Sequence, residues 1–221
     1  MNRKFLHLII VIVLIIAISI GIFISTNKRN NENTNNINIS NENATIQESN
    51  NKENNQNITT NSNNNILVTY FSATGTTQNI AEYIAEETTG KLIEIVPKEK
   101  YSPDDLNYNN DDCRANKEQN DENARPEIEN SIDFDDYDII FIGYPIWWGD
   151  VPKIILTLLD NYNLDGITVI PFCTSGGSGI NQSENTLKSY NTNINWLGGK
   201  RFSSSSTKSE VSTWIQDLNI K

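Results

Sequence analysis

Short apolar runs alternate with segments of helical periodicity over most of the chain. Five runs have the length and the content of β-branched and aromatic residues that buried strands require, and they lie at residues 66–71, 92–96, 138–143, 167–172 and 193–197. Apolar residues recur at helical spacing after the first run and after Pro152, and a last helix is predicted to begin at Thr207, which forms a capping box with Glu210. The alternation predicts an α/β domain with a parallel sheet covered on both faces.

The beginning of the chain has a different pattern. Residues 5–24 form a run of about 20 mostly apolar residues, which as a helix would cross a hydrocarbon core of about 30 Å. A cleaved signal peptide is the alternative, but its apolar region is normally about 7–15 residues long, so residues 1–25 are predicted to be an uncleaved transmembrane anchor. Arg3 and Lys4 precede the run and favour an extracytoplasmic domain, although two basic residues just after it nearly balance them.

The composition changes after this anchor. Residues 26–64 are rich in Asn, with scattered Ser, Thr and Glu and no apolar period. Such a segment buries too little apolar surface to offset its chain entropy, so it is predicted to be a disordered linker. The remaining residues, 65–221, are enough for one domain with its own core.

The first apolar run of this domain leads into a loop rich in hydroxyl groups and then into a helix. The loop carries Ser72, Thr74, Gly75, Thr76 and Thr77. Hydroxyl groups and the free N–H groups at a helix N-terminus can converge on one small anion, and a phosphate is the anion expected there. The loop has no Lys or Arg and matches neither a P-loop nor a dinucleotide fingerprint. Helix capping and turn formation are the alternative role of these residues.

Two further loops follow strands at the carboxyl ends where doubly wound sheets bind ligands. The loop after the third apolar run consists of Pro145, Ile146, Trp147, Trp148, Gly149 and Asp150. Adjacent side chains leaving a strand point in different directions, so at most one Trp is expected in the core, and the other can cover a flat aromatic ligand. The loop after the fourth run consists of Thr174, Ser175, Gly176, Gly177 and Ser178, and is either a set of exposed backbone N–H groups for a ligand or a plain flexible loop.

These three loops resemble those of the flavodoxin family. Ser72 to Thr77 matches the family pattern Thr/Ser-x-Thr-Gly-x-Thr, which holds the phosphate of FMN. Trp148-Gly149-Asp150 matches the family's Trp-Gly-Asp, in which the Trp lies against the flavin ring, whereas the preceding Pro145-Ile146-Trp147 departs from the pattern and leaves open which Trp stacks. The third loop matches the one at the pyrimidine edge but lacks its usual aromatic residue. The resemblance covers residues 65–221 and implies a five-stranded sheet of order 2-1-3-4-5 with FMN bound by all three loops.

The resemblance implies an electron-transfer protein that works with redox partner proteins or a small-molecule acceptor. The Pro-x-Trp-Trp pattern is also similar to flavodoxin-fold NAD(P)H:quinone reductases, so an FMN-dependent oxidoreductase is the alternative. A flavin-free surface binding module is a third possibility. The net charge of −11 argues against nucleic acid as a partner, because backbone binding needs a basic surface. With a single His, the chain has no recognisable metal site or Ser-His-Asp set.

Residues 97–131 interrupt the alternation of strands and helices. This 97–131 segment is polar and acidic, and its distinctive residues are Tyr101, Tyr108, Cys113, Arg114 and Arg125. Loops of this length are usually functional or disordered, so the segment is either a cover beside the cofactor or a solvated excursion. The only cysteines, Cys113 and Cys173, are expected to be independent free thiols.

Overall fold

The computed structural model describes residues 64–220. The anchor predicted over residues 1–25 lies outside the described residues, as does the predicted 26–64 linker except for Asn64. Within the described part of the chain, no helix is both long and apolar enough to cross a membrane.

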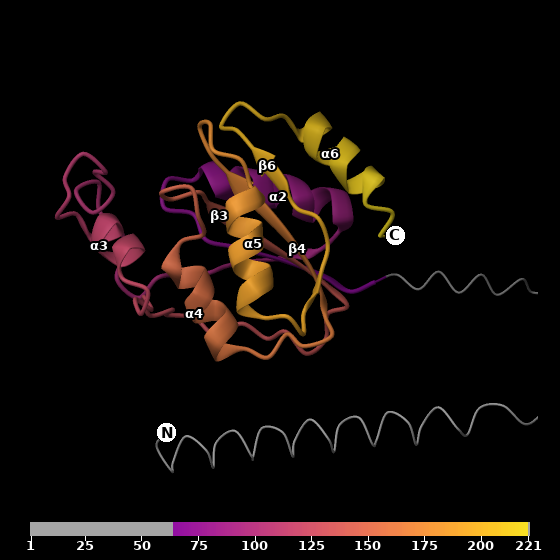
Figure 1. Ribbon diagram of the computed structural model, residues 1–221. Coiled ribbons are helices and arrows are strands. Elements are labelled where there is room, and N and C mark those ends of the chain that lie inside the picture. Colours follow the sequence, from indigo (N-terminus) through magenta and orange to yellow (C-terminus); the bar gives the residue numbers. More distant parts are fainter. Residues whose placement is uncertain (1–63, 221) are drawn as a thin grey trace, which may run out of the picture. The chain divides into compact units, whose positions relative to one another are not determined.

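A parallel sheet forms the centre of the domain (Figure 1). Its strands are β1 (Ile66–Tyr70), β2 (Lys91–Glu94), β3 (Ile139–Pro145), β4 (Thr168–Thr174), β5 (Asn195–Trp196) and β6 (Lys200–Phe202). They lie in the order β2-β1-β3-β4-β5, with β6 also paired to β4, and every pairing is parallel. The predicted α/β class and the order 2-1-3-4-5 are therefore confirmed.

The sheet edge beyond β4 differs from the prediction of a single strand over residues 193–197. Two short strands share this edge: β5 pairs with the beginning of β4, and β6 pairs with its end. Gly199 lies between them, and a Cβ atom there would be only 2.3 Å from the carbonyl oxygen of Pro171. The missing side chain allows this close approach. The strand expected over residues 193–197 is thus only the two residues of β5, and β6 beyond Gly199 was not predicted.

Helices cover both faces of the sheet (Figure 1). They are α2 (Thr76–Thr88), α3 (Arg114–Asn120), α4 (Lys153–Asn161), α5 (Asn181–Tyr190) and α6 (Lys208–Asp217). Helices α2 and α6 share one apolar core with the sheet, and α4 and α5 share the other. The predicted capping box of Thr207 and Glu210 begins α6. Pro152 is the N-cap of α4 rather than its first helical residue.

The strands contribute to the two cores in alternation, because successive side chains of a strand point to opposite faces. Val68 and Phe141 belong to the core under α2 and α6, whereas Leu67 and Ile140 belong to the core under α4 and α5, and all four are fully buried. Burial on both faces explains why the central strands read as continuous apolar runs.

The two cysteines are both buried and unpaired, which confirms the expectation of independent thiols. The Sγ atom of Cys113 accepts a hydrogen bond from the N–H of Asn116 at 3.4 Å and caps α3. Cys173 lies within β4, where burial raises the pKa of its thiol to about 12. It is therefore expected to be a neutral thiol at physiological pH.

Gly143 of β3 provides a test of the packing between the central strands. It lies opposite Phe172 of β4, and a Cβ atom at Gly143 would be 2.1 Å from the ring of this fully buried side chain. We expect Gly143→Ala to lower the free energy of unfolding by about 1–3 kcal/mol, the usual range for overpacking, as measured by urea denaturation. Gly198→Ala is the control, because a Cβ atom there meets nothing within 4 Å. Equal losses in the two variants would contradict this account of the core.

Candidate functional site

The first loop lies between the end of β1 and the start of α2. Gly75 has a φ of +86°, which glycine adopts at little cost, and its N–H donates to the hydroxyl of Ser72 at 3.1 Å. No side chain among the described residues caps α2, whose first intrahelical bond runs from Asn79 N–H to the Gly75 carbonyl. The N–H groups of the first turn are thus available to an external acceptor, and the positive end of the helix dipole favours an anion.

Thr77 and Thr74 hold their hydroxyl groups in different places. Thr77 is buried, and its Oγ1 lies 2.8 Å from Oγ1 of Thr174 at the end of β4. Thr74 is exposed, and its Oγ1 lies 3.5 Å from Oγ1 of Thr76. The hydroxyl of Thr77 therefore connects the first loop to the third, while those of Thr74 and Thr76 lie nearer the surface.

The two adjacent tryptophans of the second loop have opposite environments. Trp147 packs edge-on against Phe71 and Tyr101, with ring centroids 5.5 and 5.1 Å away. Trp148 is 48% exposed. The strand geometry predicted that at most one Trp belongs to the core, and the structure assigns that position to Trp147. Trp148 is the more exposed of the two rings.

A tight turn links Trp147 to Asp150. The backbone N–H of each residue donates to the carbonyl of the other, at 3.0 and 2.9 Å. Between them, Trp148 and Gly149 have φ angles of +51° and +80°, as in a type I′ turn. A positive φ is uncommon for a bulky residue such as Trp148 and costs roughly 1–3 kcal/mol, so the surrounding structure must hold the turn in place.

Two polar side chains hold this turn. Gln119 of α3 donates from Nε2 to the carbonyl oxygens of Trp147 and Val151, at 3.1 and 3.3 Å. The carboxylate of Asp150 accepts from the N–H of Val151 at 2.7 Å and from the hydroxyl of Thr186 at 2.8 Å. Asp150 was predicted as a cofactor contact, but its side chain is engaged within the protein. Gln119 was not identified from the sequence.

The third loop is held by contacts that sequence analysis did not foresee. The carbonyl of Thr174 accepts from the N–H of Ile146 at 2.9 Å, so the second and third loops meet there. Arg201 of β6 donates to the hydroxyl and the carbonyl of Ser175, at 3.1 and 2.8 Å. The hydroxyl of Ser175 in turn donates to the carbonyl of Ser178. Gly176 and Gly177 are exposed.

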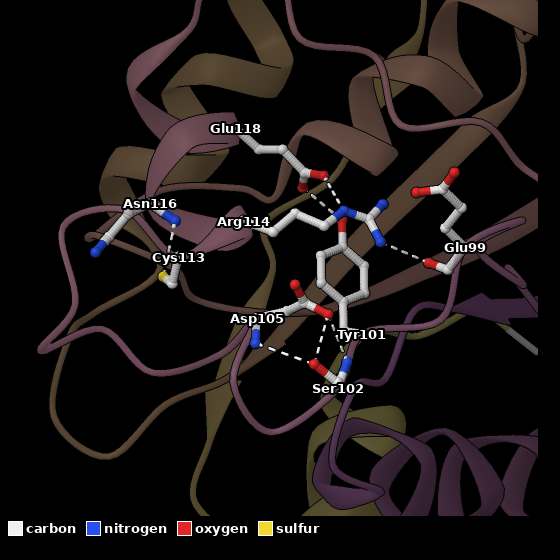
Figure 2. A network of polar contacts seen from close by, with 8 residues as sticks. All are labelled: Glu99, Tyr101, Ser102, Asp105, Cys113, Arg114, Asn116 and Glu118. Carbon is white, nitrogen blue, oxygen red and sulfur yellow. Dashed lines mark hydrogen bonds and ion pairs between the residues drawn. The ribbon is translucent and has the colours of Figure 1, made fainter.

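The 97–131 segment is folded against the second loop, where Tyr101 and Gln119 contact Trp147. Its Tyr101 donates to the carboxylate of Glu118 at 2.5 Å, and Arg114 donates to the same carboxylate at 2.6 Å while its guanidinium lies 4.1 Å over the Tyr101 ring (Figure 2). Arg114 also donates to the carbonyl of Glu99 at 2.8 Å. Burial, together with Glu118, raises the pKa of Tyr101 well above its usual value, so the phenol stays a donor.

The two arginines of this segment are both paired with carboxylates. Arg114 forms an ion pair with Glu118, and Arg125 forms one with Asp160 at 2.7 Å. Both guanidinium groups are therefore engaged within the domain. Helix α3, which is part of the segment, was not predicted.

A cavity of about 430 Å³ lies where the first two loops meet the 97–131 segment. Its lining includes six of the predicted site residues, namely Thr74, Thr77, Pro145, Ile146, Trp147 and Trp148. It also includes Ala73 and, from the 97–131 segment, Leu106, Tyr108 and Ala115, which were not predicted as site residues. The volume falls in the range of roughly 300–1,000 Å³ typical of small-molecule sites. The 97–131 segment is therefore a cover beside the cavity rather than a solvated excursion.

The fold and the loops define a doubly wound α/β protein with a cavity at the carboxyl ends of its strands, where such folds bind ligands. Comparison with known proteins identifies the family within this class. The chain belongs to the flavodoxin family, because a family model described as Flavodoxin matches residues 65–218. No curated protein matches the chain.

Several solved structures are similar to this chain. A candidate flavoprotein from Bacteroides eggerthii DSM 20697 has 40% identity and a TM-score of 0.68, over 72% of this chain and 99% of its own. Another from Bacteroides uniformis ATCC 8492 has 38% identity and a TM-score of 0.67, over 69% of this chain and 98% of its own. A flavoprotein from Lactobacillus acidophilus NCFM, solved in complex with FMN, has 30% identity and a TM-score of 0.53, over 69% and 99%.

Glu118 provides a test of how the cover is fastened. Removing its carboxylate leaves the Tyr101 hydroxyl and the Arg114 guanidinium without their shared acceptor, and the Arg114 side chain is only 22% exposed. We expect Glu118→Ala to lower the free energy of unfolding by about 1–3 kcal/mol and to speed proteolysis within the 97–131 segment. Glu122→Ala, at an exposed position just beyond α3, is the control. If both variants behave like the wild type, this cluster does not fasten the cover.

Proposed function

We propose that this chain is a flavoprotein that binds FMN in the 430 Å³ cavity and transfers electrons through it. Membership of the flavodoxin family supports the proposal, as does the relative that was solved with FMN. The observation that carries it is that one cavity is lined both by the loop at the uncapped start of α2 and by the exposed ring of Trp148.

The residues present fit the phosphate and the flavin ring of FMN. The first-turn N–H groups of α2 and the hydroxyls of Thr74 and Thr76 suit a phosphate, whose charge the helix dipole and the N–H groups would balance without a Lys or Arg. The exposed ring of Trp148 suits a flat aromatic ring system.

FMN, when bound, supplies the electron-transfer chemistry, and the protein holds and shields it. Ser72 and Gly75 shape the phosphate loop through their hydrogen bond. Pro145 and Ile146 line the cavity with apolar surface and exclude water. The turn at Gly149 leaves its peptide accessible, because a Cβ atom there would meet nothing within 4 Å. Asp150 contributes indirectly, by fixing that turn.

An electron carrier is favoured over an NADPH-dependent reductase. Each arginine in the described residues already has a partner within the domain: Arg114 with Glu118, Arg125 with Asp160, and Arg201 with Ser175. The extra phosphate of NADPH is most often bound by an arginine, and none of these is uncommitted in the described part of the chain. The net charge of −11 suits a basic redox partner protein.

The alternative is an FMN-dependent oxidoreductase that reduces a small quinone-type acceptor. Leu106, Tyr108 and Ala115 favour it, because they add an uncharged wall to the cavity on the side of the 97–131 segment. Such a wall suits a neutral flat molecule better than a charged one.

FMN binding is the first test of the proposal. The full chain, incubated with FMN and desalted, should retain flavin near a 1:1 ratio. Thr77→Val should raise the Kd about tenfold, because it removes the buried hydroxyl that joins the first and third loops. Thr157→Val, which removes another buried hydroxyl on α4, is the control and should bind as the wild type does. A wild-type chain that keeps no flavin would favour the flavin-free binding module.

The same loaded protein separates the carrier from the oxidoreductase. Stopped-flow mixing with NADH and with NADPH should give slow flavin reduction if the protein is a carrier. Reduction at many turnovers per second, with a small quinone as acceptor, would displace the carrier in favour of the oxidoreductase.

We also propose that residues 1–25 anchor the protein in a membrane and that residues 26–64 tether the flavodoxin domain on its extracytoplasmic side. The support is the apolar run at residues 5–24, which Arg3 and Lys4 precede. A flexible tether of this length would have an end-to-end distance of roughly 35 Å, enough to let the domain approach membrane-bound redox partners.

Protease treatment of intact cells tests the anchor and its orientation together. We expect the protein to sediment with membranes, and added protease to cut the Asn-rich segment and release a flavin-binding fragment. A cytoplasmic protein of known location is the control for cell integrity. Protein in the soluble fraction, or protection until the cells are lysed, would contradict the anchor or the orientation, respectively.

A further inference from the structure

We infer that Tyr108 is the second aromatic side chain of the flavin site and covers the flavin ring together with Trp148. The inference rests on the proposed FMN site. The third loop, which runs from Thr174 to Ser178, has no aromatic residue. The inference therefore assigns the second aromatic contact with the ring to the 97–131 segment.

The first observation is where the exposed apolar side chains lie. Among the described residues, the large apolar side chains that are exposed are Leu92, Tyr108, Trp148 and Tyr190, at 36%, 71%, 48% and 38%. Tyr108 and Trp148 line the same cavity, whereas the other two do not. Leaving aromatic surface in water forgoes the free energy of its burial. Two exposed rings on one cavity therefore indicate a flat ligand that buries both.

The second observation is that the loop carrying Tyr108 is held by a buried side chain. Asn116, only 4% exposed, donates from Nδ2 to the carbonyl of Asn110 at 2.6 Å and to that of Tyr108 at 3.5 Å. The N–H of Tyr108 donates to the carbonyl of Leu106 at 2.9 Å. The N–H of Asn116 is capped by Cys113, as Figure 2 shows. The exposed Tyr108 thus projects from a fixed backbone.

The third observation is that one helix positions both aromatic residues. Asn116 and Gln119 are three residues apart on α3 and so lie on neighbouring positions of its surface. Asn116 holds the loop of Tyr108, and Gln119 holds the carbonyl of Trp147 in the turn that presents Trp148. The cluster of Tyr101, Arg114 and Glu118 fastens this helix to the domain (Figure 2). Helix α3 therefore sets the two rings relative to each other before any ligand arrives.

The side chain of Tyr108 can be changed without disturbing the loop at the start of α2, which would bind the phosphate. Tyr108 is exposed, and the hydrogen bonds that hold its loop run to Leu106 and Asn116 rather than to Thr77 or the start of α2. A change at Tyr108 should therefore alter the environment of the ring and leave phosphate binding and folding intact.

The test uses the full chain loaded with FMN, in Tyr108→Ala and Tyr108→Phe variants, each made with Trp148 intact and with Trp148→Ala. The readouts are the Kd for FMN and the fluorescence yield of the bound flavin, which stacked aromatic rings quench. Tyr108→Phe should match its parent in both. Tyr108→Ala should raise the Kd about five- to tenfold and, in the Trp148→Ala background, should raise the fluorescence of the bound flavin several-fold. Tyr190→Ala, which removes an exposed ring outside the cavity, is the control.

The outcomes separate this inference from the proposed function. Unchanged Kd and unchanged fluorescence in Tyr108→Ala, in both backgrounds, would overturn the role of Tyr108 while leaving the FMN site standing. A wild-type chain that binds no FMN would overturn both. Urea denaturation of each variant shows whether a loss of binding comes from unfolding, and the high exposure of Tyr108 leads us to expect unchanged unfolding midpoints.

Discussion

The carboxyl ends of parallel strands all lie at the same end of a sheet, so the loops that follow them are neighbours. In this domain Thr174 holds the three loops together. Its hydroxyl bonds to Thr77 of the first loop at 2.8 Å, and its carbonyl accepts from Ile146 of the second loop at 2.9 Å. The Thr77–Thr174 bond spans the whole width of β3, which lies between β1 and β4. Because both hydroxyls are buried, the loss of either would leave the other without a partner at a cost of about 1–3 kcal/mol. The relative position of all three loops depends on this residue.

The elements that the sequence predicted are those whose signal is local. Continuous apolar runs marked the central strands because β1, β3 and β4 are buried on both faces, and the capping box marked the start of α6. Helix α3 escaped prediction because it has only seven residues, too few to be stable alone, and depends on tertiary contacts such as that between Glu118 and Tyr101. Strand β6, which was not predicted, likewise depends on the approach of Gly199 to Pro171, which no local pattern encodes.

The same distinction holds within the candidate site. The hydroxyl loop and the tryptophan loop could be found from the sequence, because each is a contiguous motif. Which tryptophan is exposed could not, since the answer depends on how Phe71 and Tyr101 pack against Trp147. Tyr108 was noted only as a distinctive residue of the 97–131 segment. Its place on the cavity depends on the buried amide of Asn116, and a sequence without its fold gives no sign of that contact.

The turn that presents Trp148 is ordered before any ligand binds. A positive φ at Trp148 costs roughly 1–3 kcal/mol, and the hydrogen bonds from Gln119 and to Asp150 offset this cost within the protein itself. A ligand that stacks on Trp148 therefore need not supply the free energy to form the turn. The free-energy cost of ordering the site on binding is therefore smaller than it would be for a mobile loop. The polar contacts of α3 thus affect affinity without touching the ligand, because they set the conformation of the loop that does.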